Sequence, residues 1–408
     1  MAVFLNKVNS YVWGTPTVLL IFFTGVILSL RTRFFQIRYF KAAFKTFFKK
    51  ADTNTNSKMS PFQSASTALS ATMGTGNIVG VAGAVALGGP GAVFWMWVSS
   101  FFCMIIKFAE IALSVRYREQ APDGSYHGGA MYYIKNGLNL KWLAALFAVF
   151  AMIACLGTGN ATQSNSIAVA LESTIGITPW ITGVVLTIIV AAVILGGMRR
   201  ISSVNEKLVP IMAVFYVVCA LIALMINIEK IPAAFALIFK EAFNFKAATG
   251  GVAGYGIMLA MHYGFSRGVF SNEAGLGSAP IAHAASSTKS PVKQGLWGIF
   301  EVFFDTFVIC TLTALVILVS FGSTAPNTPN GFYNVLYAGK YADTEVSMMA
   351  FSNAFSHFGV IVYSIILPLF AFTTILAWSY YGEKSIDFLF RKTGEKGRKI
   401  SRIVFKVL

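Results

Sequence analysis

Long apolar runs separated by short charged segments form the pattern of this chain. A membrane-spanning helix needs about 20 predominantly apolar residues, and runs of that kind recur along the sequence. They lie near residues 14–31, 60–88, 91–115, 142–170, 179–198, 208–228, 250–283, 294–320 and 354–381. The pattern predicts an all-α polytopic membrane protein with nine complete spans. Residues 399–408 turn apolar again, as at the start of a further span.

Composition supports the membrane prediction and removes two other classes of protein. Hydrophobic residues make up 56% and charged residues 12% of the 408 residues, whereas soluble domains have roughly 25% charged residues. The net charge of +16 could suit nucleic acid, but that partner needs a basic face on a soluble domain. Here the basic residues fall between apolar runs, so we expect no nucleic-acid partner. The four cysteines lie in apolar runs without metal-ligand spacing, which favours neither disulfides nor zinc.

The distribution of basic residues predicts the orientation of the chain. Lys and Arg accumulate in cytoplasmic loops. If the N-terminus is outside, the inward loops hold 25 of the 32 Lys and Arg residues and the outward segments hold 5. This alternation predicts a multi-pass protein of the cell (inner) membrane with its N-terminus outside.

One inward segment, residues 33–50, has the residue spacing of an amphipathic helix. Phe40, Phe44 and Phe47 recur on one face, with Lys41 and Lys45 between them. A helix of this type lies on an anionic membrane surface with its aromatic face in the lipid. The sequence therefore predicts the anionic cytoplasmic leaflet as a partner.

Two predicted spans carry polar, glycine-containing interruptions. The first contains Gly74-Thr75-Gly76 and Asn77 in its middle, and the second contains residues 264–278. Because freed backbone groups have no water in lipid, such breaks persist only beside protein, a cavity or a ligand. Four intact spans separate the breaks, so the two broken spans run in opposite directions. Interrupted helices opening two inverted units are typical of secondary transporters.

This repeat divides the chain into three units. Residues 1–59 hold an extra N-terminal span and the basic amphipathic segment. Residues 60–228 form a first five-helix repeat, and residues 229–408 form a second, inverted repeat. Only three complete spans fall in the second repeat, so we expect its last two helices to be missing from this sequence.

A broken helix offers unpaired backbone groups of both polarities. The amides of Gly74, Thr75 and Gly76 would face a carboxylate, and the carbonyl groups from Ser70 to Met73 would face a hard cation such as sodium. The competing interpretation is that Gly76 and Gly80, spaced GxxxG, only allow close helix packing.

Charged residues within spans are usually paired or functional. Lys107 and Glu110 are three residues apart on one helix, and we expect them to neutralise each other. Glu301 and Asp305 are one turn apart near the inner end of their span. Two roles fit this pair equally well: gating of the pathway, or simple solvation at the membrane surface.

The second break is flanked by Arg267 and Glu273. They are either a structural pair that holds the unwound segment or residues with a coupling or gating role. In the 142–170 span, Gln163 lies in a run of polar residues and can both donate and accept hydrogen bonds. We expect it to contact the substrate, although packing against neighbouring helices is a competing role for this run.

The last complete span places Thr373 and Thr374 at membrane depth. They either bond back to their own helix or complete a sodium site with the carbonyl groups of the first break. Trp378 is a wall or gate of the pathway, or an interfacial tryptophan. The histidines lack metal spacing and no nucleophile–base motif occurs, so the chain is not expected to be an enzyme.

Three runs are similar to a known family. TALSATMGTGNIVGVAGAVALGGPGAVFWMWV (67–98), FSNEAGLGSAPIAHAA (270–285) and WSYYGEK (378–384) closely resemble the alanine or glycine:cation symporters, also called sodium:alanine symporters. The resemblance covers nearly the whole chain. It implies eleven spans, an extra first helix followed by a leucine-transporter-like five-plus-five inverted repeat.

The resemblance also implies an activity and a site. It implies cation-coupled symport of small neutral amino acids such as alanine or glycine by alternating access, with sodium, or alternatively protons, as the coupling ion and no other cofactor. The candidate substrate-binding residues are Thr72, Gly74, Thr75, Gly76, Asn77, Gln163, Phe270, Ser271 and Trp378. Fold analogy puts Ser70, Met73, Thr373 and Thr374 around sodium. The alternative function is an uncoupled amino-acid or ion channel or facilitator; oligomeric state and the preferred enantiomer stay open.

Overall fold

The computed structural model describes residues 12–48, 59–121, 124–243, 255–321, 343–355, 357–391 and 393–407. Helices account for nearly all of them, together with a short antiparallel hairpin of β1 (Glu119–Gln120) and β2 (Tyr126–His127). The predicted all-α class is therefore confirmed.

The described part of the chain consists mainly of successive helical elements. In chain order they are α2 (Thr15–Arg31), α3 (Phe35–Arg38), α4 (Phe40–Phe48), α5 (Pro61–Thr72), η1 (Thr75–Asn77), α6 (Val79–Gly88), α7 (Gly91–Arg116), α8 (Ala130–Gly137), α9 (Lys141–Ala154), η2 (Cys155–Ala161), α10 (Thr162–Ile175), α11 (Pro179–Ile194), α12 (Gly197–Ile226), η3 (Ile228–Lys230), α13 (Ile231–Ala242), α14 (Tyr255–Asn272), α15 (Ala279–His283), α16 (Pro291–Val302), η4 (Phe303–Cys310), α17 (Thr311–Phe321), α19 (Asp343–Phe355), α20 (His357–Leu389) and α21 (Gly394–Val407).

Among the described residues, each predicted span corresponds to a helix or to two successive helices; residues 250–254 of the predicted 250–283 span lie outside them. Within the described residues, five helical stretches are long and apolar enough to cross a membrane, and the bent pair α5 and α6 makes a sixth. α2 and α11 are apolar but have only 17 and 16 residues. The chain is thus a multi-pass membrane protein. The boundaries differ most at α12, which runs without interruption through residues 199–207, where the sequence predicted a loop.

Proline and serine mark where several of these helices begin. Pro61, Pro179 and Pro291 each occupy the first turn of a helix, where the missing N–H costs nothing. At α5 the Ser60 hydroxyl accepts from the Gln63 amide, and the Gln63 side chain accepts from the Ser60 amide, both at 3.0 Å. This capping box fixes the start of the first broken span.

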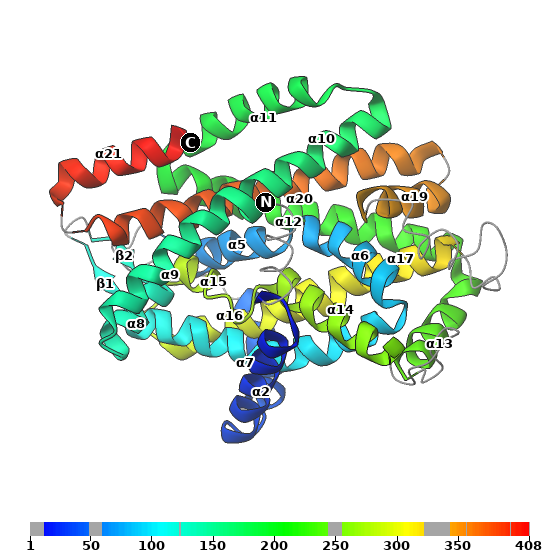
Figure 1. Ribbon diagram of the computed structural model, residues 1–408, viewed down its shortest axis with the longest axis horizontal. Helices are drawn as coiled ribbons and strands as arrows, with labels where there is room; N and C mark the ends of the chain where they lie inside the picture. The colour runs from blue at the N-terminus through cyan, green and yellow to red at the C-terminus, as the bar shows by residue number, and fades with distance from the viewer. Residues whose placement is uncertain are drawn as a thin grey trace.

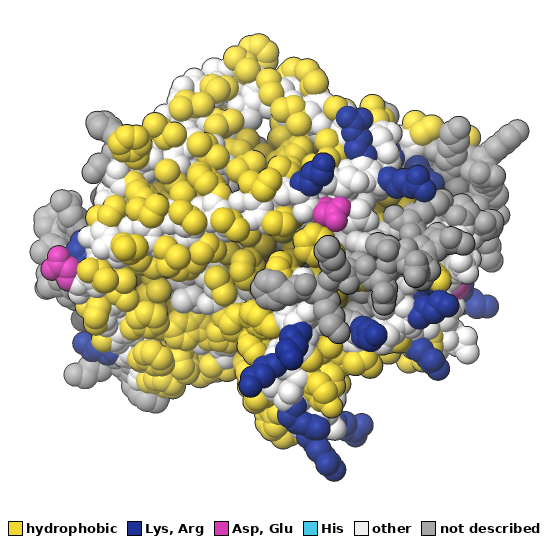
Figure 2. Space-filling model, turned by 180° about the vertical axis from the view of Figure 1, so that it is seen from behind, with side chains coloured by type: hydrophobic (Ala, Val, Ile, Leu, Met, Phe, Trp, Pro, Cys, Tyr) yellow, Lys and Arg dark blue, Asp and Glu magenta, His cyan; other side chains and the backbone are white. Residues whose placement is uncertain are grey.

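The long helices run side by side along the length of the molecule. Figure 1 shows α7, α12 and α20 close to horizontal, with the hairpin, α8 and α21 at the left end and α13 and α19 at the right end. These ends correspond to the loops that the charge count assigned to opposite sides. Figure 2 shows a broad hydrophobic side, with most of the visible Lys and Arg at the hairpin end and on the projection formed by the N-terminal helix region.

The first apolar helix lies across this direction. In Figure 1, α2 leaves the bundle at a large angle to the long helices, and Val12 and Trp13 before it border the central cavity. α2 is therefore not parallel to the other apolar helices, although the sequence predicted it as a span. The division into units 1–59, 60–228 and 229–408 stays a prediction.

The basic amphipathic segment is corrected by the structure. It is not one helix, since α3 and α4 meet at a kink. The aromatic face of α4 packs on α16 and η4, with Phe44 and Phe47 centroids 5.3 and 4.6 Å from the Phe300 ring. Lys41 and Lys45 are exposed. Aromatic residues of the next layer therefore cover part of this face, and the anionic cytoplasmic leaflet stays a predicted partner.

The C-terminal helix packs back on the helix before it. Arg402 of α21 pairs with Asp387 of α20, and Lys406 Nζ lies 3.0 Å from Glu383 Oε2. α21 is therefore an amphipathic helix that packs along α20.

Candidate functional site

The first break lies where α5 gives way to α6. α5 ends at Thr72, Gly74 adopts an extended conformation with φ −125° and ψ −155°, and η1 forms a single tight turn. The two helices differ in direction by 55°. A side chain at Gly74 would lie 2.5 Å from the Thr374 hydroxyl oxygen, so this position requires glycine for close approach and not for its dihedral angles.

The amides of the first break have side-chain acceptors. Thr75 N donates to Gln163 Oε1 at 3.3 Å, and Gly74 N donates to Asn77 Oδ1 at 3.0 Å. Gln163 itself donates to Thr158 O at 3.3 Å. The structure therefore brings Gln163 to the break, as expected, with its amide oxygen at the backbone N–H that was predicted to face a carboxylate.

Ser70 and Thr374 meet on the other side of this break. Thr374 Oγ1 donates to Ser70 O at 2.9 Å, which joins α20 to the end of α5. Asn205 of α12 donates to Ser70 Oγ at 2.8 Å, and its Oδ1 atom has no hydrogen-bond partner among the described residues. Asn205 was not predicted, because it lies in the charged stretch 199–207, which the sequence predicted as a loop.

The other two predicted sodium residues are oriented differently. The Thr373 hydroxyl donates to Phe370 O at 3.0 Å within its own helix and lies 3.4 Å from Met212 Sδ. Met73 N donates to Leu69 O at 2.7 Å as the last bond of α5. Back-bonding therefore describes Thr373, whereas Thr374 also reaches the break.

The second break separates α14 from α15. Glu273, Gly275 and Gly277 have φ of +56°, +89° and +72°. These left-handed conformations are easy for glycine but costly for glutamate. The segment is therefore irregular over several residues, as the sequence predicted.

The charged residues of α7 hold this second break and do not pair with each other. Lys107 Nζ donates to Asn272 O at 2.7 Å, and the Glu110 carboxylate accepts from the amides of Gly275 and Gly277 at 3.1 Å each. The expected neutralisation between Lys107 and Glu110 is wrong. The unsatisfied polar groups of the break attract each charge more directly than the other side chain does.

The two breaks are joined by a buried polar network. Asn77 Nδ2 donates to Asp305 Oδ1 at 2.6 Å and to Ser271 Oγ at 3.0 Å. Ser271 Oγ donates to Asp305 Oδ2 at 2.8 Å. Asn77 and Asp305 have no exposed surface. Asn77 and Ser271, predicted to bind substrate, thus bind each other and Asp305, and solvation of Asp305 is excluded.

Glu301, its predicted companion, is also buried. Its two carboxylate oxygens lie 2.8 Å from His283 Nε2 and 3.9 Å from Lys107 Nζ. Plain solvation is therefore excluded for Glu301 as well.

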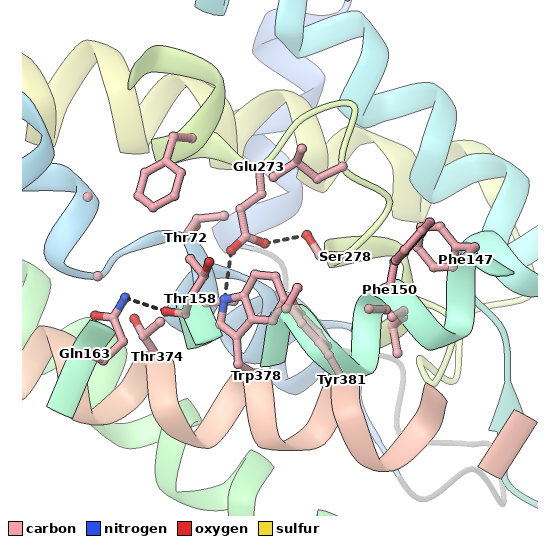
Figure 3. A pocket seen from close by; sticks show the side chains of 18 of the residues that line it. Thr72, Phe147, Phe150, Thr158, Gln163, Glu273, Ser278, Thr374, Trp378 and Tyr381 are labelled. Atoms are coloured by element: carbon pink, nitrogen blue, oxygen red, sulfur yellow. Dashed lines mark hydrogen bonds between the residues drawn. The ribbon is translucent and has the colours of Figure 1, made fainter. Parts of the chain in front are cut away.

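A cavity of about 510 Å³ lies between the two breaks. Eight of the residues nominated from the sequence line it, namely Thr72, Gly74, Gly76, Gln163, Phe270, Glu273, Thr374 and Trp378. Figure 3 shows Gln163 and Thr374 at one end, Trp378 facing Glu273 in the middle, and Phe147 and Phe150 at the other end. Thr75 contributes its backbone amide to Gln163. The nominated residues from four distant segments are thus brought together.

Glu273 has different partners from those predicted. Its carboxylate accepts from Trp378 Nε1 at 3.0 Å and from Ser278 Oγ at 2.6 Å. Arg267 instead lies 3.7 Å from Asp343 at the start of α19. The proposed structural pair of Arg267 and Glu273 is therefore wrong. Asp343 follows a long polar stretch in which nothing marks it as a partner.

Two wide helical turns flank the site. η2 and η4 are π-helical segments within the stretches α9–α10 and α16–α17; the sequence analysis did not predict either segment. η2 carries Thr158 and Gly159, and a side chain at Gly159 would overlap Trp378. η4 carries Asp305. Such segments often occur at functional sites, and these two supply side chains to the cavity wall and to the polar network.

Comparisons with known proteins agree with the predicted resemblance. The model of the Sodium:alanine symporter family matches residues 1–408. The sodium/alanine symporter AgcS of Methanococcus maripaludis is 45% identical over 407 residues, which is 98% of this chain and 86% of that protein. An uncharacterized transporter of Haemophilus influenzae is 42% identical over 406 residues, 99% of this chain and 85% of that protein.

A solved structure is similar in fold. The crystal structure of the Eremococcus coleocola manganese transporter aligns with a TM-score of 0.55 at 10% identity, covering 88% of this chain and 72% of that one. At this identity the likeness concerns the fold alone, which is the leucine-transporter-like fold predicted above.

Proposed function

The chain belongs to the sodium:alanine symporter family, and from this premise we propose that it carries small neutral amino acids such as alanine or glycine across the membrane together with sodium. The observation that supports this most is the first break. It places a backbone amide and the Gln163 side chain on one side, and a carbonyl oxygen with the Thr374 hydroxyl on the other. One break thus presents groups for an anion and for a cation.

We assign the amino acid to the cavity end at Gln163. A substrate carboxylate would take the place of Gln163 Oε1 at Thr75 N, and Gly74 and Gly76 leave room for it because they have no side chains. Phe270 approaches a side-chain position at Gly76 to 3.4 Å, so it limits the size of the substrate there. This arrangement favours small neutral amino acids.

We assign sodium to the oxygen atoms around Ser70. The Ser70 carbonyl oxygen, the Thr374 hydroxyl and Asn205 Oδ1 are hard oxygen ligands of the kind that alkali and alkaline-earth cations prefer. Met73 and Thr373 remain second candidates, which would need to turn toward the ion. Sodium and amino acid then bind on opposite sides of one short segment, so each would stabilise the ordered break for the other.

Alternating access would occur around the first break, which would stay in place while the helices beside it move. Phe147 and Phe150 line the cavity from α9, the helix that follows the hairpin and α8 along the chain, so the cavity extends toward that end. At the opposite side, Arg267 and Asp343 join α14 to α19. If the hairpin end is cytoplasmic, as the charge count predicts, the arrangement is an inward-facing state closed outside by Arg267. Arg267 is thus one residue with a gating role, and Glu273 in the cavity wall is the second residue with a coupling or gating role.

The decisive experiment is uptake by proteoliposomes that contain the purified protein. Radiolabelled alanine is offered with an inward sodium gradient, with equal sodium on both sides, or with choline in place of sodium. We expect accumulation above the external concentration only with the sodium gradient. A fourth arm with an inward proton gradient and no sodium tests proton coupling.

Uptake that merely equilibrates alanine in every arm would overturn coupled symport and support an uncoupled facilitator. Competition by unlabelled glycine, serine, glutamine and D-alanine then measures the substrate range. Strong competition by glutamine but not by glycine would contradict the assignment of a small substrate.

A further inference from the structure

Helix α7 carries two opposite charges, Lys107 and Glu110, one turn apart inside the membrane. We propose that they are a positioning pair: Lys107 binds the end of α14 and Glu110 binds the amides of the segment that follows, and together they set Glu273 into the transport cavity. The inference rests on the proposed function only where alanine uptake is measured. The conformation of the second break is measured separately, by labelling a cysteine in it.

The Lys107 contact satisfies a helix end. Asn272 is the last residue of α14, and its carbonyl oxygen has no amide partner further along the helix. Lys107 Nζ donates to this oxygen at 2.7 Å, and the lysine side chain is completely buried. The end of a helix carries partial negative charge, so a buried ammonium group is stabilised there and fixes where α14 stops.

The Glu110 contact has the opposite polarity. Gly275 and Gly277 have left-handed dihedral angles, so their amides leave the helical pattern and need other acceptors. The two Glu110 oxygens each accept one of these amides at 3.1 Å. Hydrogen bonds to a charged acceptor are stronger than neutral ones, so this carboxylate holds the irregular segment in one shape.

These two anchors bracket Glu273 along the chain. Asn272 precedes it directly, and Gly275 follows it by two residues. Glu273 has φ +56°, a conformation that a non-glycine residue keeps only when its surroundings impose it. Its carboxylate then reaches Trp378 and Ser278 in the cavity wall. The charges on α7 therefore act on the site through the backbone on both sides of Glu273.

A simple ion pair explains the geometry less well. Among the described residues, the carboxylate oxygen within 4 Å of Lys107 Nζ is Glu301 Oε2 at 3.9 Å, which is farther than Asn272 O at 2.7 Å. Glu301 Oε1 lies 2.8 Å from His283. Glu301 thus balances charge near Lys107, while the short contact of Lys107 is to the break.

The test compares four variants with the wild type: Lys107→Met, Glu110→Gln, the exchange Lys107→Glu with Glu110→Lys, and Glu301→Gln. The matched control is Leu113→Ala, an exposed position on the same helix. Alanine KM and Vmax are measured in proteoliposomes, and thermal stability is measured in detergent. In parallel, a Leu276→Cys reporter in the break, on the cavity wall, is labelled with a water-soluble maleimide.

We expect Lys107→Met and Glu110→Gln to raise KM by about tenfold or more, because each removes one or two charge-assisted hydrogen bonds. Both should change the labelling rate of the Leu276→Cys reporter several-fold. The charge exchange should be at least as damaging, since it places each charge against backbone groups of its own sign. Glu301→Gln and Leu113→Ala should change KM less than threefold.

Recovery of wild-type KM by the charge exchange would overturn the proposal, because only a mutual ion pair survives exchange. An effect of Glu301→Gln as large as that of Lys107→Met would also overturn it. If Lys107→Met does not fold, Lys107→Arg and Glu110→Gln decide: arginine should keep KM within about threefold, and an unchanged KM in Glu110→Gln would refute the pair. An inactive wild type would refute the symport proposal alone, whereas unchanged labelling in Glu110→Gln would refute the positioning pair.

Discussion

Replacing Gly74 by alanine tests the assignment of sodium to the first break. The added methyl group would lie 2.5 Å from Thr374 Oγ1 and 3.4 Å from Gln163 Oε1. The backbone of Gly74 is extended, and alanine adopts that conformation without strain. The whole effect of the substitution is therefore steric and falls on Thr374.

The size of the effect depends on the hydrogen bond that Thr374 loses and on the crowding that the new methyl group causes. Turning its side chain away breaks the 2.9 Å hydrogen bond to Ser70 O, which contributes about 0.5–1.5 kcal/mol. Crowding a well-packed site costs a further 1–3 kcal/mol or so. Since about 1.4 kcal/mol is a tenfold change in an equilibrium constant, we expect the sodium concentration for half-maximal uptake to rise at least about tenfold.

The assay is alanine uptake as a function of sodium, with Gly80→Ala as the matched control. A side chain at Gly80, in α6, meets no atom within 4 Å, and alanine is favoured there by about 1 kcal/mol as a helix former. Gly80→Ala should leave the sodium dependence unchanged. A sodium dependence in Gly74→Ala that equals that of Gly80→Ala would refute the role of Thr374 in binding sodium.

Three further substitutions test other parts of the site. Gln163→Ala removes the amide side chain that, once displaced from Thr75 N, would hydrogen-bond the substrate, and it should raise alanine KM about three- to tenfold without lowering the melting temperature; unchanged affinity removes Gln163 from the site. Trp378→Phe keeps a ring but loses the hydrogen bond to Glu273, so uptake at low alanine should fall about tenfold or more, whereas normal uptake would show that this bond is dispensable. In the hairpin, burial raises the pKa of Glu119, but hydrogen bonds from a neighbouring lysine and asparagine lower it more, and the net pKa is below its usual range. Glu119→Gln should therefore lower the melting temperature slightly at neutral pH, by less than about 1 kcal/mol in stability, and the difference should vanish as pH falls through that lowered pKa; a difference that grows in acid would contradict the assignment.

The sequence predicted the spans and both breaks because those features are local. A run of about 20 apolar residues is long enough to identify by itself, and glycine beside polar residues in such a run is rare for a physical reason. The same reasoning located Gly74 and Gln163, whose residue types are unusual in their segments. These residues do line the cavity.

The partners of the charged residues could not be predicted in the same way. Arg267 pairs with Asp343, and Lys107 binds a backbone oxygen 165 residues away. Such contacts depend on how helices pack, and residue spacing within one helix says nothing about them. The spacing rule favoured Lys107 with Glu110 because they share a helix face, whereas the unpaired backbone of another helix was the stronger partner.

The residues that cover the α4 aromatic face could not be predicted for a similar reason. Helical periodicity identifies an apolar face but does not identify what covers it. For Phe44 and Phe47, the covering group is Phe300, and lipid was the simpler expectation for a segment between spans. The π-helical turn η4 was missed because no glycine or proline interrupts it. η2 does contain Gly157 and Gly159 beside polar residues, but that run was interpreted only as a set of substrate contacts or packing contacts.

The hydrogen bond between Asn77 and Asp305 joins residues 228 positions apart, and this separation governs the order in which the protein can be built. The chain enters the bilayer from its N-terminus, so the first broken span arrives long before the stretch α16–α17 that carries Asp305. Until then, the Asn77 amide and the freed backbone around it lack their native partner in a solvent that offers none. Assembly of the first break is therefore a late event in biogenesis, and substitutions at Asp305 should leave a nascent chain that is exposed to quality-control proteases at a segment synthesised much earlier.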